Sequence, residues 1–125
     1  MTEIKLLIAD DSMLMRDIIK ESILETFPYI NIREAAAGDD AQRMIESEHF
    51  DMVLCDWEMP GLSGIDLLRW VRSTPALETL PFVMVTGTTE KKSVVECIEA
   101  GVTDYIVKPL TPEDLCQKIK RIMKL

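Results

Sequence analysis

Residues 4–11 read Ile-Lys-Leu-Leu-Ile-Ala-Asp-Asp, a nearly continuous apolar run that ends in two aspartates. Such a run is typical of a strand buried on both faces, because a strand with one face in water alternates apolar and polar residues. Similar runs return at Asp51–Asp56 and Pro81–Val85. Strands covered on both faces belong to parallel sheets flanked by helices, so these segments predict an α/β protein.

Helices are predicted between the strands, each with an apolar stripe that would face the core. The stripes are, in chain order, Met15, Ile19, Ile23 and Phe27; Ala41, Met44 and Ile45; Ile65, Leu68 and Val71; Val94, Cys97 and Ile98; and Leu115, Ile119, Ile122 and Met123. Ser12 and Asp39 are placed to cap the first two helices, and Pro112 suits the first turn of the last.

Two further strands complete the pattern. Asn31–Ala36 alternates weakly and suits an edge strand, and Val102–Val107 precedes the last helix. Five strands then alternate with five helices, without an internal repeat or a linker. The natural solution is a doubly wound parallel sheet with helices on both faces. A chain of 125 residues has the length of one domain, predicted here over residues 1–125.

Composition excludes several classes of partner. Lysine and arginine number 14 against 22 aspartates and glutamates, a formal charge of −8. Phosphate backbones and anionic lipids repel such a chain, so neither nucleic acid nor a membrane is expected as a partner. No apolar run reaches the roughly 18 residues that cross a bilayer, and no export signal follows Met1, which predicts a cytoplasmic protein. Cys55, Cys97 and Cys116 lack zinc or redox spacing and are expected to be buried.

Polar residues close the strands where ligands bind in doubly wound sheets, outside the carboxyl ends. Asp10 and Asp11 follow the first strand, Asp56 the third, Thr86 the fourth and Lys108 the fifth. Three carboxylates brought together repel one another, so they require a proton or a cation. An oxygen-only ligand set favours a hard ion, and Mg²⁺ suits it better than zinc. Asp10 and Asp11 could alternatively be an N-cap pair, and Lys108 an ordinary surface lysine.

The same residues suggest phosphoryl transfer. A carboxylate can attack phosphorus, and Mg²⁺ together with Lys108 would neutralise charge on the transferring group. Thr86 could donate a hydrogen bond to that group, with the small Gly87 leaving space beside it. The product would be an aspartyl phosphate on Asp56, a temporary mark that suits a signal.

Four short motifs make the interpretation more specific. They are Asp10-Asp11, Asp56-Trp57-Glu58-Met59-Pro60-Gly61, Thr86-Gly87 and Lys108-Pro109. Their order and spacing resemble the receiver domains of two-component response regulators, and nearly the whole chain is similar to the stand-alone receivers of the CheY chemotaxis type. The resemblance implies a flavodoxin-like fold with strand order 2-1-3-4-5; receivers of this type are themselves a known example of the doubly wound rule.

The resemblance also implies roles for individual residues. Asp56 is the phosphoacceptor, and Lys108 and Thr86 contact the phosphoryl group. The magnesium ligands are Asp11, Asp56 and the backbone carbonyl of Glu58, with Asp10 acting through a water. Thr86 and Tyr105 form a switch; the alternative for Tyr105 is an ordinary half-buried strand tyrosine. The peptide between Lys108 and Pro109 is expected to be cis.

By the same resemblance the phosphodonor is a histidine kinase or a phosphotransfer protein. The chain would be a phosphoacceptor that promotes its own phosphorylation and dephosphorylation rather than an enzyme, and a monomer. A downstream protein would bind the face of the fourth helix, fifth strand and fifth helix. Basic residues gather there and could attract an acidic partner, or simply form a solvated helix face: Lys91, Lys92, Lys118, Lys120, Arg121 and Lys124.

Other functions fit the sequence less well. An aspartyl-nucleophile phosphatase of the haloacid dehalogenase type would carry a DxD motif after the first strand, where this chain has Asp10-Asp11-Ser12. A flavodoxin-like FMN carrier needs a hydroxyl-rich phosphate loop at that place, and the two aspartates would repel the phosphate. Within signalling, a chemotaxis output, a phosphorelay intermediate, a phosphate sink and a stress or developmental regulator all remain open.

Overall fold

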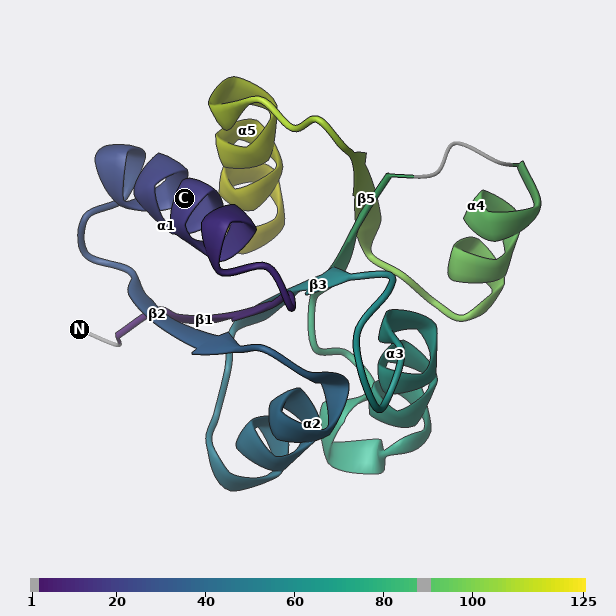
Figure 1. Cartoon of the computed structure of the whole chain (residues 1–125). Helices are drawn as coiled ribbons and strands as arrows, with labels where there is room; N and C mark the ends of the chain where they lie inside the picture. Colours follow the sequence, from purple (N-terminus) through teal and green to yellow (C-terminus); the bar gives the residue numbers. More distant parts are fainter. Residues whose placement is uncertain (1–2, 88–90) are drawn as a thin grey trace.

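The computed structural model describes residues 3–87 and 91–125 (Figure 1). The described part contains one parallel sheet of five strands in the order β2-β1-β3-β4-β5. The strands are β1 Lys5–Ala9, β2 Asn31–Ala35, β3 Met52–Asp56, β4 Phe82–Thr86 and β5 Asp104–Val107. This confirms the predicted doubly wound α/β fold and its strand order, with β2 at one edge.

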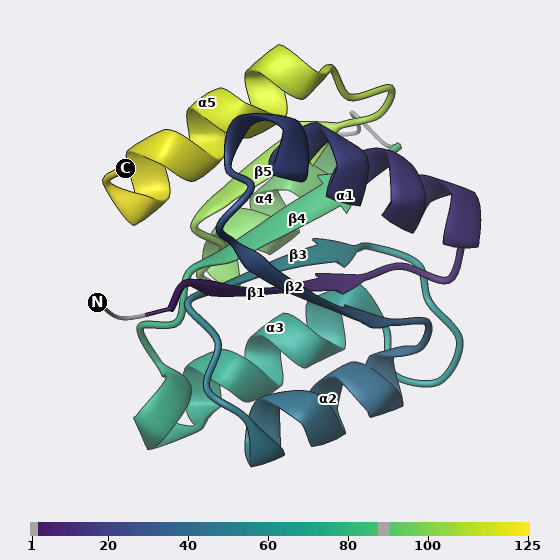
Figure 2. The same ribbon diagram turned by 90° about the vertical axis from the view of Figure 1, so that its left-hand side faces the viewer.

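Helices cover both faces of the sheet. They are α1 Met13–Thr26, α2 Gly38–Ser47, α3 Gly64–Ser73, α4 Lys91–Glu99 and α5 Pro112–Met123, with a short 3-10 helix η1 at Pro75–Leu77. Figure 2 shows α1 and α5 above the sheet and α2 and α3 below it. Within residues 3–87 and 91–125, no helix has the length and apolar character needed to cross a membrane.

The central strands are apolar throughout because each face contributes to a separate core. In β1, Leu6 and Ile8 pack with α1 and α5, whereas Leu7 and Ala9 pack with α2 and α3. All four side chains are at most 1% exposed. This double burial explains why residues 4–11 show no alternation.

The register of the sheet aligns the strand ends. Ala9 pairs with Ala35 and Cys55, so Asp10 and Asp56 lie at neighbouring positions beyond them. On the other side, Thr86 pairs with Val107, immediately before Lys108. The strand order reverses at β1 and β3, and the side chains predicted to meet therefore lie at the carboxyl edge beside this reversal.

The structure also corrects three expectations. Asp39 does not cap α2, because the helix begins at Gly38 and the Asp39 carboxylate accepts the Leu62 N–H instead, at 2.8 Å. Strand β5 begins at Asp104 rather than Val102, since the Val102 N–H donates to the Cys97 carbonyl and completes the end of α4. Cys116 is only half-buried, unlike the other two cysteines.

Candidate functional site

The carboxyl edge of the sheet gathers the acidic residues of three chain segments. One side-chain oxygen from each of Asp10, Asp11 and Asp56 lies within 4.8 Å of the others. The Lys108 Nζ lies 3.2 Å from Asp56 Oδ1 and 3.5 Å from Asp10 Oδ2. The peptide after Lys108 is cis, as the resemblance implies. The three aspartates anticipated from the strand ends thus lie together, and Lys108 contacts two of them.

Asp10 is the most constrained member of the cluster. It is only 2% exposed, and its Oδ1 accepts the Ser12 N–H at 2.9 Å. Its backbone carbonyl accepts a hydrogen bond from Arg16, at 2.7 Å. Among the described residues, its Oδ2 has no hydrogen-bond partner although it is buried. The Lys108 ammonium lies 3.5 Å from this oxygen without hydrogen-bonding to it, and it is shared with Asp56. A buried carboxylate oxygen without a hydrogen bond is costly, so the site favours a further cation beside Asp10.

Asp56 has a pKa above its ordinary value of 3.8. Burial is the main cause, because it disfavours the charged form, and the negative charge of Asp10 adds to it. The Lys108 ammonium acts in the opposite direction without overcoming these effects. A divalent cation among the three carboxylates would reverse the balance and keep Asp56 ionised, which is the form that can act as a nucleophile.

These residues fit a hard divalent cation. The cluster offers only carboxylate oxygens, and no thiolate or imidazole takes part in it. Mg²⁺ retains several waters and accepts one or two carboxylates, which agrees with one buried and two more accessible donors. Glu58 lies two residues after Asp56 in the chain, and its side chain is exposed. Its backbone carbonyl is the ligand that the resemblance implies.

A polar cavity of about 500 Å³ opens beside the cluster. It is lined by Asp56, Trp57, Glu58, Thr86, Gly87, Ser93 and Lys108. Among residues 3–87 and 91–125, no atom lies within 4 Å of a Cβ added at Gly87, so the described residues leave room for a ligand on this side of the cavity. A phosphoryl group on Asp56 would lie in this space, close to Lys108.

Ser93 was not anticipated from the sequence. It lies near the start of α4 and lines the same cavity as Lys108. The only signal for it was its place near the start of the helix that follows β4, because that helix begins at the carboxyl edge. Its involvement depends on how α4 packs, which periodicity does not reveal.

Tyr105 lies next to the site without lining the polar cavity. It is half-buried on β5 and shares a small apolar hollow with Thr86, Val94 and Cys97. Trp57 and Ser93 border both this hollow and the polar cavity. The structure thus places the two residues of the predicted switch side by side, while their movement stays a prediction.

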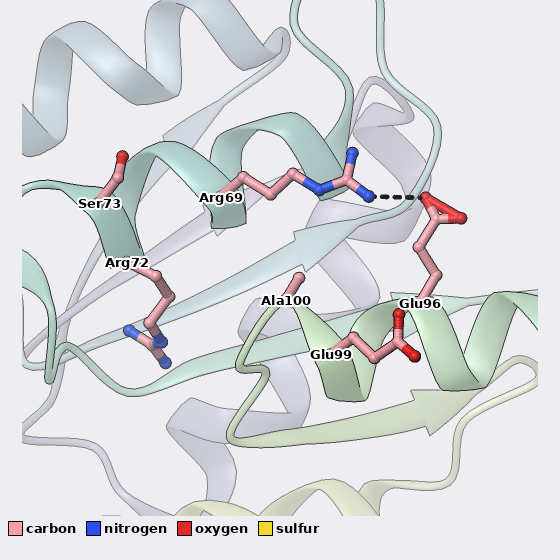
Figure 3. A pocket seen from close by; sticks show the side chains of 6 residues that line it. All are labelled: Arg69, Arg72, Ser73, Glu96, Glu99 and Ala100. Atoms are coloured by element: carbon pink, nitrogen blue, oxygen red, sulfur yellow. Dashed lines mark hydrogen bonds and ion pairs between the residues drawn. The ribbon is translucent and has the colours of Figure 1, made fainter.

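A second hollow lies between α3 and α4, away from the acidic cluster (Figure 3). Arg69 and Glu96 form an exposed ion pair across it, at 3.2 Å. Arg72 donates to the carbonyls of Gly101 and Leu80, at 2.8 and 2.7 Å, which precede β5 and β4. These contacts connect α3 to the amino ends of the strands, so the hollow has a structural explanation.

Comparison with known proteins agrees with this geometry. The model of the response regulator receiver domain family matches residues 6–120. The chemotaxis protein CheY of Pseudomonas aeruginosa is 43% identical over 120 residues, covering 96% of both chains. CheY-3 of Vibrio cholerae is 40% identical over 96% of this chain and 92% of its own.

Solved structures show the same architecture. The chemotaxis response regulator CheY4 of Vibrio cholerae has a TM-score of 0.88 at 27% identity, covering 97% of this chain and 99% of its own. A CheY-like receiver domain protein from Methanospirillum hungatei has a TM-score of 0.87 at 31% identity, covering 98% and 96%. The family model matches residues 6–120, and the relatives align with nearly all of this chain. The chain therefore belongs to the response regulator receiver domain family.

Proposed function

We propose that this chain is a phosphorylation-dependent switch of two-component signalling, with Asp56 as the Mg²⁺-dependent phosphoacceptor. The observation that carries the proposal is the unsatisfied carboxylate cluster, with a lysine in contact, beside an open polar cavity. In a purely structural cluster each buried polar atom would have a hydrogen bond, which Asp10 Oδ2 lacks among the described residues. The phosphodonor is a phosphohistidine on a histidine kinase or a phosphotransfer protein.

In the transfer step, an ionised Asp56 oxygen attacks the phosphorus of the phosphohistidine. A new P–O bond forms while the P–N bond breaks, and the imidazole nitrogen keeps the electron pair. The Lys108 ammonium, 3.2 Å from Asp56 Oδ1, is placed to pair with the phosphoryl oxygens as they arrive. The Thr86 hydroxyl and Lys108 then hold the product. Hydrolysis of the acyl phosphate returns Asp56 to its carboxylate.

Asp11, Asp56 and the Glu58 backbone carbonyl would hold Mg²⁺, with Asp10 contributing through a water. The ion would supply positive charge to the phosphoryl oxygens. The remaining work belongs to the chain's own residues. Asp10 and Asp56 provide the negative charge that attracts the ion, and the cavity beside Gly87 admits the donor.

The signal would leave through the face formed by α4, β5 and α5. Val95 and Ile98 are 41% and 60% exposed on α4, which gives this face an apolar component. Lys118 and Arg121 pair with Asp114 and Asp104, so part of the predicted basic character is already neutralised. Lys91 and Lys92 have side chains outside the described part. The proposed target therefore offers an apolar contact together with a few acidic groups.

The named relatives are chemotaxis proteins, which supports a chemotaxis output over a phosphorelay intermediate, a phosphate sink or a stress or developmental regulator. We further propose one receiver domain over residues 1–125, acting as a cytoplasmic monomer and not as an enzyme on a separate substrate. The acidic charge of −8 disfavours nucleic acid as a target.

Acetyl phosphate, Mg²⁺ and intact-mass measurement test the proposal. Wild-type protein is expected to gain one hydroxylamine-labile phosphoryl group, and Asp56→Asn none. Asp66→Asn is the matched control, because Asp66 is an exposed aspartate on α3 that should leave labelling unchanged. Equal labelling of wild type and Asp56→Asn, or labelling that survives removal of Mg²⁺ by EDTA, would contradict the mechanism.

A further inference from the structure

The loop of residues 57–63 joins β3 to α3 and carries Glu58. If the Glu58 carbonyl is a magnesium ligand, its direction is set by how this loop is held, because a backbone oxygen has no side-chain torsions to adjust. The contacts that fix the loop therefore matter for the site. Two of them come from the first turn of α2.

Asp39 makes the side-chain contact. Its Oδ1 accepts the Leu62 backbone N–H at 2.8 Å, a charge-assisted hydrogen bond. One residue earlier, the Gly38 N–H donates to the Pro60 carbonyl at 3.3 Å. The start of α2 thus holds the loop at two successive points, through one donor and one acceptor.

Two glycines allow this close approach. A Cβ at Gly38 would lie 1.8 Å from the Leu62 carbonyl oxygen, a distance that no real side chain can adopt. Gly61 has φ +73°, and a Cβ there would lie 2.8 Å from both carboxylate oxygens of Asp39. The backbone of the loop is thus packed directly on α2 around the Asp39 carboxylate.

The other end of the loop is equally fixed. The Gly64 N–H donates to the Trp57 carbonyl at 2.9 Å, and a Cβ at Gly64 would lie 2.2 Å from the Asp56 carbonyl oxygen. Glu58 therefore lies between a fixed phosphoacceptor end and the Asp39 contact. Loss of the Asp39 contact would free one side of the segment while leaving the other in place.

We propose that Asp39 is a positioning residue for the metal site: its hydrogen bond to Leu62 fixes the loop that presents the Glu58 carbonyl, and so sets the affinity for Mg²⁺. This rests on the proposed function. Asp40 provides the contrast, because it also lies in the first turn of α2 but pairs with Arg43 on the helix surface.

Three variants separate the hydrogen bond from the charge. Asp39→Ala removes both, Asp39→Asn keeps an acceptor oxygen but removes the charge, and Asp40→Ala removes a charge from the same helical turn without touching the loop. Mg²⁺ affinity is measured by titration of Trp57 fluorescence. The exchange rate of the Leu62 amide hydrogen, measured by NMR without Mg²⁺, reports on the contact itself, and circular dichroism checks folding.

Asp39→Ala is expected to weaken Mg²⁺ binding about tenfold, the lower end of the range for groups that orient a metal ligand. Its Leu62 amide should exchange faster, while Asp39→Asn should stay close to wild type in both measurements and Asp40→Ala should match wild type in Leu62 exchange. Equal Mg²⁺ affinity of Asp39→Ala and Asp40→Ala would overturn the inference, as would an Asp39→Asn variant as weak as Asp39→Ala. If wild-type protein labels on Asp56 in either case, the proposed function survives; a wild type that binds no Mg²⁺ overturns both.

Discussion

The two ends of the sheet each carry a cluster of charged residues, but the clusters differ in the balance of charge. At the amino end, the Glu48 carboxylate forms ion pairs with the Lys5 ammonium, at 2.6 Å, and with the Arg33 guanidinium, at 2.8 Å. The Lys5 backbone N–H donates to Asp51 at 2.8 Å. Each of these carboxylates has a donor, and the network connects β1 and β2 to the segment that leads into β3.

At the carboxyl end, the negative groups outnumber their partners. Lys108 is shared between Asp56 and Asp10, and Asp10 Oδ2 still lacks a hydrogen bond among the described residues. The pKa directions reflect this difference. The pKa of Glu48 falls below its ordinary 4.5, chiefly through the hydrogen bond from Lys5, while the pKa of Asp56 is raised, chiefly by burial. Completed pairing marks a structural cluster, and a deficit of positive charge marks a site prepared for an ion.

The largest effect is expected from the addition of Mg²⁺. Mg²⁺ at a hundred times its dissociation constant should raise the free energy of unfolding by about 2.7 kcal/mol, if the unfolded chain does not bind it. Urea denaturation with and without Mg²⁺ measures this gain. Asp11→Asn should lose most of it, whereas Glu48→Gln should keep it. A gain that survives in Asp11→Asn would place the ion elsewhere.

A smaller effect should come from Asp10 itself. Without Mg²⁺, Asp10→Asn is expected to be more stable than wild type by about 1 kcal/mol, because an unsatisfied buried carboxylate costs more than the neutral amide. With Mg²⁺ the order should reverse. Urea denaturation under both conditions gives the comparison. A destabilised Asp10→Asn in metal-free buffer would show that the Lys108 contact already satisfies Asp10.

The pH dependence should have opposite signs at the two ends. Without metal, folded protein holds the Asp56 proton to a higher pH than the unfolded chain, so stability is lost as pH rises from about 4 toward the raised pKa. The stability of Asp56→Asn relative to wild type should therefore increase over that pH range. Glu48 has a lowered pKa, so its stabilisation is present above about 4.5 and is lost as pH falls.

Denaturation midpoints of Asp56→Asn, Glu48→Gln and wild type across this pH range test the two signs. The difference between Asp56→Asn and wild type should grow with pH. The deficit of Glu48→Gln should shrink as pH falls. Parallel curves for the two variants would remove the distinction between the clusters.

The smallest effect is expected from the ion pair across the hollow between α3 and α4. Arg69 and Glu96 are 53% and 36% exposed, and exposed ion pairs contribute about 0.2–1 kcal/mol. Arg69→Ala should change the free energy of unfolding by that amount or less and leave phosphorylation of Asp56 unchanged. Urea denaturation and intact-mass labelling check both points. A loss of labelling would show that the ion pair in this hollow affects phosphorylation of Asp56.

Local patterns were sufficient for the strands at the centre of the sheet. The runs at β1, β3 and β4 are apolar throughout because both faces are covered, and the residue after each run necessarily reaches the carboxyl edge. The convergence of Asp10, Asp56 and Lys108 followed from this geometry and from parallel pairing. The near-complete burial of Asp10 did not follow from the strand pattern, since it depends on tertiary packing.

Local sequence patterns were insufficient where a contact depends on a distant partner. Asp39 has the sequence context of a helix cap, but the loop after β3 supplies the N–H that its carboxylate accepts. Arg121 belongs to a basic helix in sequence, yet it pairs with Asp104 on β5. Ser93 enters the cavity through the packing of α4. None of these contacts lies within the range of helical or strand periodicity.

The position of Cys55 bears on the lifetime of the proposed acyl phosphate on Asp56. An acyl phosphate is an activated carboxyl group that a thiolate could intercept as a thioester. The Cys55 thiol donates to the Asp56 backbone carbonyl at 3.2 Å, and burial raises its pKa well above 9.0. It also packs with the core on the α2 and α3 side of the sheet. The sulfur beside the proposed phosphoacceptor is thus kept protonated and packed into the core, which would leave water to hydrolyse an acyl phosphate on Asp56.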